Sequence, residues 1–247
     1  MTNKIPERRG RVMKVLAIGC HPDDLEIACG GTLRKYVEEG ADVYMCHVAN
    51  GNMGHVEILP EPLREIRTIE SEAAGKIIGA KKVFNLDVGD VTVTRFDNDV
   101  VDAMADVVRE VRPDVIITHN DEDYMQDHVE TSRIAFNGSF VSSLAHKSVN
   151  FAAYDEFVPI YFMDTLGGVN FIPTHYVDIT NQIETKLEAL KKHESQIKWM
   201  FEHDHIDFID MIRTCSRYRG YQSGVTYAEG FRPCTVYPRM TTKHLLP

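Results

Sequence analysis

The sequence lacks several features that define large classes of proteins. Its five cysteines contain no CxxC pair, which argues against a disulfide framework and against a cysteine-rich zinc site. No apolar run approaches the roughly 18 residues of a membrane span. The basic N-terminal segment MTNKIPERRGR leads into a short strand-like run and not into the apolar stretch of a signal peptide. We therefore expect a cytoplasmic chain with reduced cysteines and no membrane span.

Positive charge is also scarce. The formal net charge is −10 and the Lys and Arg residues are scattered, so the basic stripe expected of a nucleic-acid-binding protein is missing. An apolar content of 43% with 26% charged residues is typical of a globular chain and not of a disordered one. A chain of 247 residues is long enough to bury a substantial core. These properties predict a single domain over residues 1–247 that acts on a small molecule.

The first half of the chain alternates between strand and helix patterns. Apolar, β-branched runs predict buried strands at 12–20, 42–48, 82–86 and 114–119. Apolar residues at helical spacing predict helices at 25–39, 62–78, 98–111 and 128–144. This order predicts an α/β fold with a largely parallel sheet and helices on both faces.

The second half changes character. Shorter strands are predicted at 158–162 and 174–179, and helices at 182–201 and 208–219. The glycine-rich fingerprint of dinucleotide-binding folds is missing, because Gly30 and Gly31 fall inside a helix pattern and not in the turn after the first strand. A nucleotide-dependent oxidoreductase is therefore disfavoured.

Metal-ligating residue types follow two of the predicted strands. The segment CHPDD at 20–24 follows the first strand, and HNDEDYMQDH at 119–128 follows the fourth. If the strand order is 3-2-1-4, both loops face the crevice where doubly wound sheets bind ligands. Imidazole nitrogens with one carboxylate oxygen are the donors of a catalytic zinc site. From these residues alone, a structural role is the alternative. An aspartate after the strand would cap the following helix, and Glu26 in its first turn would interact favourably with the helix dipole.

Several motifs occur in order along nearly the whole chain. They are HPDDLEIACGGTL, NGNMGH, LREIRTIESEAAGKIIGA, RPDVIITH, DYMQDH, KLEALKKHESQ and RYRGYQSGVTYAEGFRP. In sequence and order they resemble the motifs of the LmbE-like, or PIG-L, family of zinc-dependent N-deacetylases. The resemblance implies a Rossmann-like α/β fold, a tendency to form homo-oligomers, and hydrolysis of an acetamide on an N-acetylglucosamine unit.

The resemblance also assigns roles around a metal ion. It implies that His21, Asp24 and His128 bind Zn²⁺, although such a ligand set accepts other divalent metals. It implies that Asp23 is the general base and that Asp127 supports a catalytic histidine. Two adjacent aspartates would thus serve the metal and the proton transfer separately.

Three further residues match family positions that face the substrate. Arg67 and Asp90 fall where family members contact the sugar, and His193 matches the late-helix motif. For Arg67, an ion pair with Glu70 one turn along the helix is an alternative. Trp199 and Met200 are interpreted as core residues and not as a substrate platform.

Two positions depart from the family pattern. Met125 replaces a histidine of the H-x-D-H motif that assists the oxyanion or the leaving amine, and a thioether cannot donate a proton. Candidate replacements are His55, His119, His193 and Tyr124. Cys20 replaces an alanine and is interpreted as packing, not as a ligand. The leading hypothesis is a deacetylase; the alternative is a catalytically weakened member that binds metal and sugar.

Overall fold

The computed structural model describes residues 11–147 and 149–247, so almost all of the basic N-terminal segment lies outside the described residues. The centre of the fold is one seven-stranded mixed sheet with the order β3-β2-β1-β4-β5-β7-β6. Its strands are β1 (Lys14–Gly19), β2 (Asp42–Ala49), β3 (Lys82–Val88), β4 (Val115–Thr118), β5 (Ile160–Met163), β6 (His175–Asp178) and β7 (Ala228–Pro233). Strands β1 to β5 pair in parallel, and β7 runs antiparallel to both of its neighbours. The α/β prediction and the predicted order 3-2-1-4 are confirmed.

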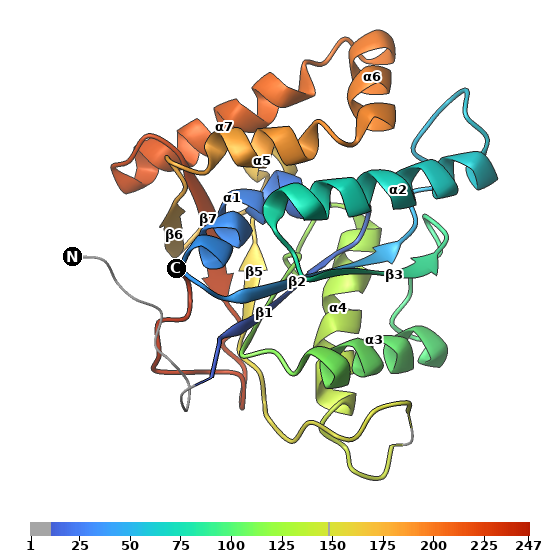
Figure 1. Cartoon of the computed structure of the whole chain (residues 1–247), viewed down its shortest axis with the longest axis vertical. Coiled ribbons are helices and arrows are strands. Elements are labelled where there is room, and N and C mark those ends of the chain that lie inside the picture. The colour runs from blue at the N-terminus through green and yellow to red at the C-terminus, as the bar shows by residue number, and fades with distance from the viewer. Residues whose placement is uncertain (1–10, 148) are drawn as a thin grey trace.

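Helices cover both faces of this sheet (Figure 1). On one face lie α1 (Asp24–Glu38), α2 (Pro60–Ile78), α5 (Ile183–Leu190), α6 (Glu194–His203) and α7 (Phe208–Ser223). On the other lie α3 (Asn98–Val111) and α4 (Gln126–Val141). A short 3₁₀ turn, η1 (Leu166–Gly168), follows β5. Among residues 11–147 and 149–247, no helix is both long and apolar enough to cross a membrane.

Strand β1 shows why this chain forms a sheet buried on both sides. Val15 and Ala17 point into the hydrophobic cluster under α1, α5 and α7, whereas Leu16 and Ile18 point into the cluster under α3 and α4. Since side chains alternate along a strand, a continuous apolar run is the pattern of a strand covered on both faces.

The middle of α1 packs closely against the segment around Ile179 and against β7. A Cβ atom on Gly31 would lie 2.8 Å from the Ile179 side chain, which is closer than atoms can approach. The Gly31 amide also donates to Glu229 Oε1 of β7 at 2.9 Å. Gly31 of the GG pair therefore allows α1 to pack against the C-terminal half of the chain. This packing explains the glycine without a nucleotide phosphate.

The C-terminal half departs from the predicted elements. The helix predicted over 182–201 is broken, because α5 ends in tight turns in which Lys192 N and His193 N donate to Ala189 O and Leu190 O. Strand β7 was not predicted. Its sequence AEGFRP contains glycine and proline, which strands disfavour, and it forms because its two neighbours supply hydrogen-bond partners on both sides.

Candidate functional site

The loop between β1 and α1 carries the first candidate residues. Asp23 precedes α1 with φ 123° and ψ −28°, a conformation that costs a non-glycine residue about 1–3 kcal/mol. Among the described residues its side chain makes no capping hydrogen bond to the helix. The interpretation of Asp23 as a simple helix cap is therefore wrong. The unusual backbone instead directs Asp23 and Asp24 toward different partners.

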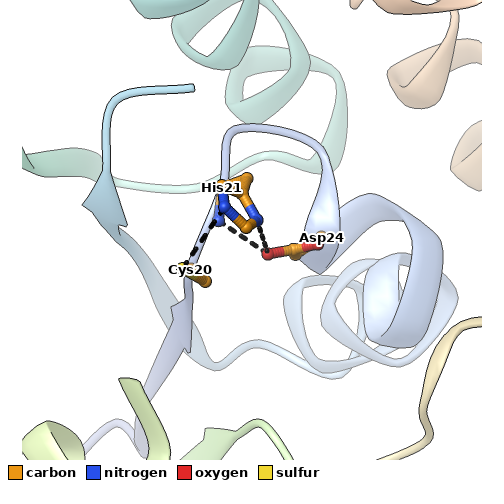
Figure 2. Close-up of side chains that lie close together, drawn as sticks. All are labelled: Cys20, His21 and Asp24. Atoms are coloured by element: carbon orange, nitrogen blue, oxygen red, sulfur yellow. Dashed lines mark hydrogen bonds and ion pairs between the residues drawn. The ribbon is translucent and has the colours of Figure 1, made fainter. Parts of the chain in front are cut away.

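Asp24 lies at the centre of the candidate metal site. Its Oδ2 accepts from His21 N at 2.6 Å and lies 3.5 Å from His21 Nδ1 (Figure 2). The same oxygen lies 3.2 Å from His119 Nε2 and 3.4 Å from His128 Nε2. Ligands bound at about 2.0–2.1 Å in a tetrahedral zinc site lie about 3.3–3.4 Å from one another. The spacing of these donors therefore fits a divalent ion.

His128, on the first turn of α4, is held in an orientation suited to a metal ligand. Its Nδ1 pairs with Asp123 Oδ2 at 3.1 Å, while its Nε2 is buried and has no hydrogen-bond partner within the described part of the chain. Burial acts to lower the pKa of His128, but the carboxylates of Asp24 and Asp123 raise it to about 10. The site therefore favours a cation beside Nε2. A carboxylate behind a ligating histidine is a frequent outer partner in metal sites.

Two overlapping groups of side chains have the spacing of metal ligands. Asp24, His119 and His128 place ligand atoms within 4.8 Å of one another, and so do Cys20, His21 and Asp24. His119 Nε2, however, already accepts a hydrogen bond from Cys20 N at 2.9 Å. Burial and the neighbouring His128 lower the pKa of His119 to about 4, so its ring is neutral and that lone pair is in use. His119 must give up this bond before it can bind an ion.

His21 is held from the opposite side by Asp127. His21 Nε2 lies 3.4 Å from Asp127 Oδ2, which also accepts from Val91 N at 2.8 Å. The rings of His21 and His128 lie 5.5 Å apart. The structure thus brings His21 and His128 to Asp24, and the assignment of these three residues as the ligand set stays a prediction. Asp127 contacts His21, and its role as a supporting carboxylate also stays a prediction.

Asp23 pairs with a buried arginine. Arg67 Nη2 donates to Asp23 Oδ2 at 3.0 Å and to the carbonyl of Pro22, and Nη1 donates to Gly51 O at 3.2 Å. Burial raises the pKa of Asp23 to about 6, with the Asp24 charge adding to the rise and Arg67 opposing it. Asp23 is therefore a carboxylate that can both accept and return a proton near neutral pH.

The loop after β2 packs around the same arginine. Gly51 has φ 77°, and a Cβ there would lie 2.5 Å from Arg67 Nη1. Asp90 holds this loop, since its two oxygens accept from Gly51 N at 2.8 Å and Met53 N at 3.0 Å. Asp90 and Arg67 both line the cavity at the carboxyl ends of the parallel strands, and their predicted contact with the sugar stays a prediction.

Glu70 and His193 do not occupy their predicted places. Glu70 accepts from Ser195 N at 2.7 Å and from Ser195 Oγ at 2.8 Å, so the alternative Arg67–Glu70 ion pair is wrong. His193 is fully buried, its Nε2 lies 3.4 Å from Glu26 Oε2, and it is not among the cavity-lining residues. The structure therefore places His193 in the interior beside Glu26 and not in the cavity lining.

The candidate ligands, Asp23 and Arg67 line one cavity of about 500 Å³ at the carboxyl ends of the parallel strands. Its polar lining consists of His21, Asp23, Asp24, Arg67, Asp90, His119, Gln126, Asp127, His128, Asp164 and Gln196. Met125 also lines it. Of the four candidate replacements for the missing histidine, His119 reaches the lining, whereas His55, His193 and Tyr124 do not.

Met200 packs against the hydrophobic core, as the sequence interpretation had it, and it also lines the cavity. Trp199 is partly buried between two rings, 6.1 Å from that of His55 and 5.5 Å from that of His203.

Gln196 was missed although it belongs to the HESQ motif. Ser195 Oγ donates to the Glu70 carboxylate and therefore accepts from Gln196 Nε2, at 3.3 Å. That relay fixes the amide so that Gln196 Oε1 faces the Gly54 side of the cavity as an acceptor.

Comparison with known proteins agrees with this geometry. The profile of the PIG-L family, described as GlcNAc-PI de-N-acetylase, matches residues 16–138. Diacetylchitobiose deacetylase of Thermococcus kodakarensis is 32% identical, with 93% of this chain and 86% of that protein covered. The chain belongs to the PIG-L family.

Two further proteins extend the likeness. The structure of N,N'-diacetylchitobiose deacetylase from Pyrococcus horikoshii superposes with a TM-score of 0.76 at 27% identity, covering 91% of this chain and 85% of that one. A relative of different activity, 4-oxalmesaconate hydratase of Pseudomonas putida, is 24% identical, with 92% of this chain and 90% of the hydratase covered. This PIG-L protein is an N-deacetylase with a buried candidate metal site, and both the recognition and the fold predicted from sequence are confirmed.

Proposed function

We propose that this PIG-L deacetylase is a zinc-dependent hydrolase that removes the acetyl group from an N-acetylglucosamine-type amino sugar. One observation carries the proposal. Asp24 faces three imidazoles, while the adjacent Asp23 faces the same cavity and pairs with Arg67. A binding protein has no use for a second, differently directed carboxylate beside its metal ligands.

The donor set fits a divalent ion. His128 Nε2 is buried without a hydrogen-bond partner among the described residues, and Asp24 Oδ2 lies 3.4 Å from it. His21, Asp24 and His128 would hold the ion, with Asp123 and Asp127 fixing the two rings. When bound, the ion would polarise the acetyl carbonyl and acidify a nearby water. These donors suit several divalent ions. The choice of zinc therefore rests on the family resemblance.

The protein's own residues then carry the proton transfers. Asp23 takes a proton from the attacking water and later delivers it to the nitrogen of the departing amine. Arg67 holds the Asp23 carboxylate in place through a 3.0 Å contact. The relay through Ser195 directs Gln196 Oε1 toward a hydroxyl or N–H of the sugar.

The alternative, a weakened member that binds metal and sugar, is favoured by Met125, which lines the cavity where the family motif has a histidine. Asp23→Ala separates the two functions. For a deacetylase we expect amine release from N-acetylglucosamine compounds to fall by about 10²–10⁴, with zinc still bound stoichiometrically. Asp99→Asn, an exposed change on α3, serves as the control. Zinc-loaded wild-type protein that releases no amine from any compound would support the binding protein.

A further inference from the structure

Cys20 brings a sulfur atom to the candidate metal site from the core side. The residue directly follows β1, and its side chain is fully buried in the hydrophobic cluster under α3 and α4. Figure 2 shows it with His21 and Asp24, and its Sγ lies 3.7 Å from His21 Nε2. A sulfur and a nitrogen that bind one tetrahedral zinc ion, at about 2.3 and 2.0–2.1 Å, lie about 3.6 Å apart. The distance between Sγ and Nε2 therefore suits two ligands of one ion.

The carboxylate of Asp24 completes a group of three donors. One ligand atom from each of Cys20, His21 and Asp24 lies within 4.8 Å of the other two. His21 faces both partners, with its Nδ1 3.5 Å from Asp24 Oδ2 and its Nε2 3.7 Å from Cys20 Sγ. Because an ion takes one of these nitrogens, binding requires a turn of the His21 ring and an approach of the donors by about 1–1.5 Å at most.

His119 is the other candidate for this position, and its geometry is less suitable. Its Nε2 accepts from Cys20 N at 2.9 Å, so that lone pair is engaged. Its ring also stacks on that of His128, with centroids 3.9 Å apart and planes 22° apart. The lone pair of an imidazole lies in the plane of the ring, so two stacked and nearly parallel rings cannot both direct a nitrogen at one ion. The sulfur of Cys20 meets neither obstacle, since it keeps free lone pairs and has no ring plane.

A second observation points to a ligand in the same place. His128 Nε2 is buried without a hydrogen-bond partner among the described residues and lies 3.4 Å from Asp24 Oδ2, and the residue is only 4% exposed. The rings of His21 and His128 lie 5.5 Å apart with their planes tilted by 51°. Two imidazoles on one tetrahedral zinc ion have ring centroids about 5 Å apart. Cys20 therefore adjoins a group of buried donors that is arranged for an ion.

We propose that the Cys20 sulfur binds the same ion as His21 and Asp24, and that it makes the site selective for zinc and cadmium over manganese and magnesium. Thiolate ligands select softer ions, whereas carboxylate and water suit manganese and magnesium. The ion replaces the thiol proton, which leaves to solvent. Catalytic zinc sites that combine cysteine with histidine are known. This inference rests on the metal site of the proposed function and departs from the packing role that the sequence suggested for Cys20.

The first test reads the metal in the wild-type protein. X-ray absorption at the zinc edge should show one sulfur neighbour at about 2.3 Å, besides nitrogen and oxygen neighbours at about 2.0–2.2 Å. Cobalt-loaded protein should show a sulfur-to-metal charge-transfer band in the near ultraviolet. A zinc shell of nitrogen and oxygen alone would overturn the inference, and that result does not depend on the folding of any variant.

Variants assign the sulfur to one cysteine. Cys20→Ala installs the residue of the family motif, so we expect it to fold. It should abolish the charge-transfer band and lower the ratio of zinc to manganese affinity by at least about tenfold, because it removes the soft donor. The control Cys46→Ala removes a buried thiol from the same hydrophobic cluster but from neither ligand-spaced group of the described residues, and it should change neither property. A band that persists in Cys20→Ala would overturn the assignment.

These readouts keep the inference separable from the proposed function. Amine release by a protein whose zinc has no sulfur neighbour would contradict the role of Cys20 while the deacetylase stands. A zinc–sulfur neighbour that disappears in Cys20→Ala, without amine release from any N-acetylglucosamine compound, would sustain the role of Cys20 and contradict the deacetylase. A wild-type protein that binds no zinc would overturn both.

Discussion

The two halves of this chain contribute to one cavity in different ways. Residues 11–141 form the parallel strands β1 to β4 and supply most of the titratable groups, which lie in loops after these strands, on α2 or at the start of α1 or α4. Residues 160–233 add the antiparallel strand β7 and three helices, and supply Leu166, Gln196, Met200 and Phe208. The first half thus carries most of the charged lining, whereas the second half contributes mainly uncharged residues, and we expect substitutions in the two halves to have distinct signatures.

The largest effect is expected in the first half, from Asp24→Ala. Because Asp24 Oδ2 contacts three imidazoles, its removal takes away the shared centre of the candidate metal site. We expect the protein to fold, to lose stoichiometric metal and to lose amine release to background. Metal content by atomic emission and activity are measured on one sample. Retained metal would show that the ion binds elsewhere.

A second substitution tests the support behind His128. Asp123→Asn keeps the shape of the side chain but removes the charge that pairs with His128 Nδ1. Metal affinity should weaken by about 10–100-fold, as for other outer partners of ligating histidines. The control is Asp121→Asn in the same loop, whose partner is Arg133. Competition with a chelator measures the metal affinity of both variants. An Asp123→Asn variant that binds metal as tightly as the Asp121→Asn control would exclude Asp123 from the site.

Met125→His tests whether the first half lacks a donor for the oxyanion or the leaving amine. His119, the one proposed replacement donor that reaches the lining, has its Nε2 engaged with Cys20 N and a pKa near 4. We therefore expect the introduced histidine to raise kcat by at least about tenfold, toward the 10²–10³ that one oxyanion donor contributes. Steady-state kinetics on an N-acetylglucosamine glycoside provides the number. An unchanged kcat would mean that another group already performs this role.

The smallest effect is expected in the second half, from Gln196→Leu. Loss of one acceptor for a substrate hydroxyl should raise KM by about tenfold with little change in kcat, since the contact is made equally in the ground and transition states. Ser195→Ala should act in the same direction but less, because the amide of Gln196 then loses its fixed orientation. A fall in kcat alone would instead place Gln196 in the chemical step.

The meeting of the two candidate metal-ligating segments was predicted correctly, whereas the roles of their residues stay predictions. The HPDD and QDH segments follow buried parallel strands, and the order β3-β2-β1-β4 brings both to the same edge. His193 shows the opposite case. Its motif suggested substrate contact, but the break between α5 and α6 places it against Glu26 in the interior.

The sequence by itself determined the alternation of strands and helices, the family, and the residue types that meet at the carboxyl edge of the sheet. These follow from local periodicity and from motif order, which are properties of neighbouring residues. Only the tertiary structure decided that Asp23 turns to Arg67 while Asp24 turns to the histidines, and that Leu166, Met200 and Phe208 line the same cavity as these residues. Most of those relations join segments that lie far apart in the sequence, and they depend on side-chain directions and on packing across the sheet, which no local pattern encodes.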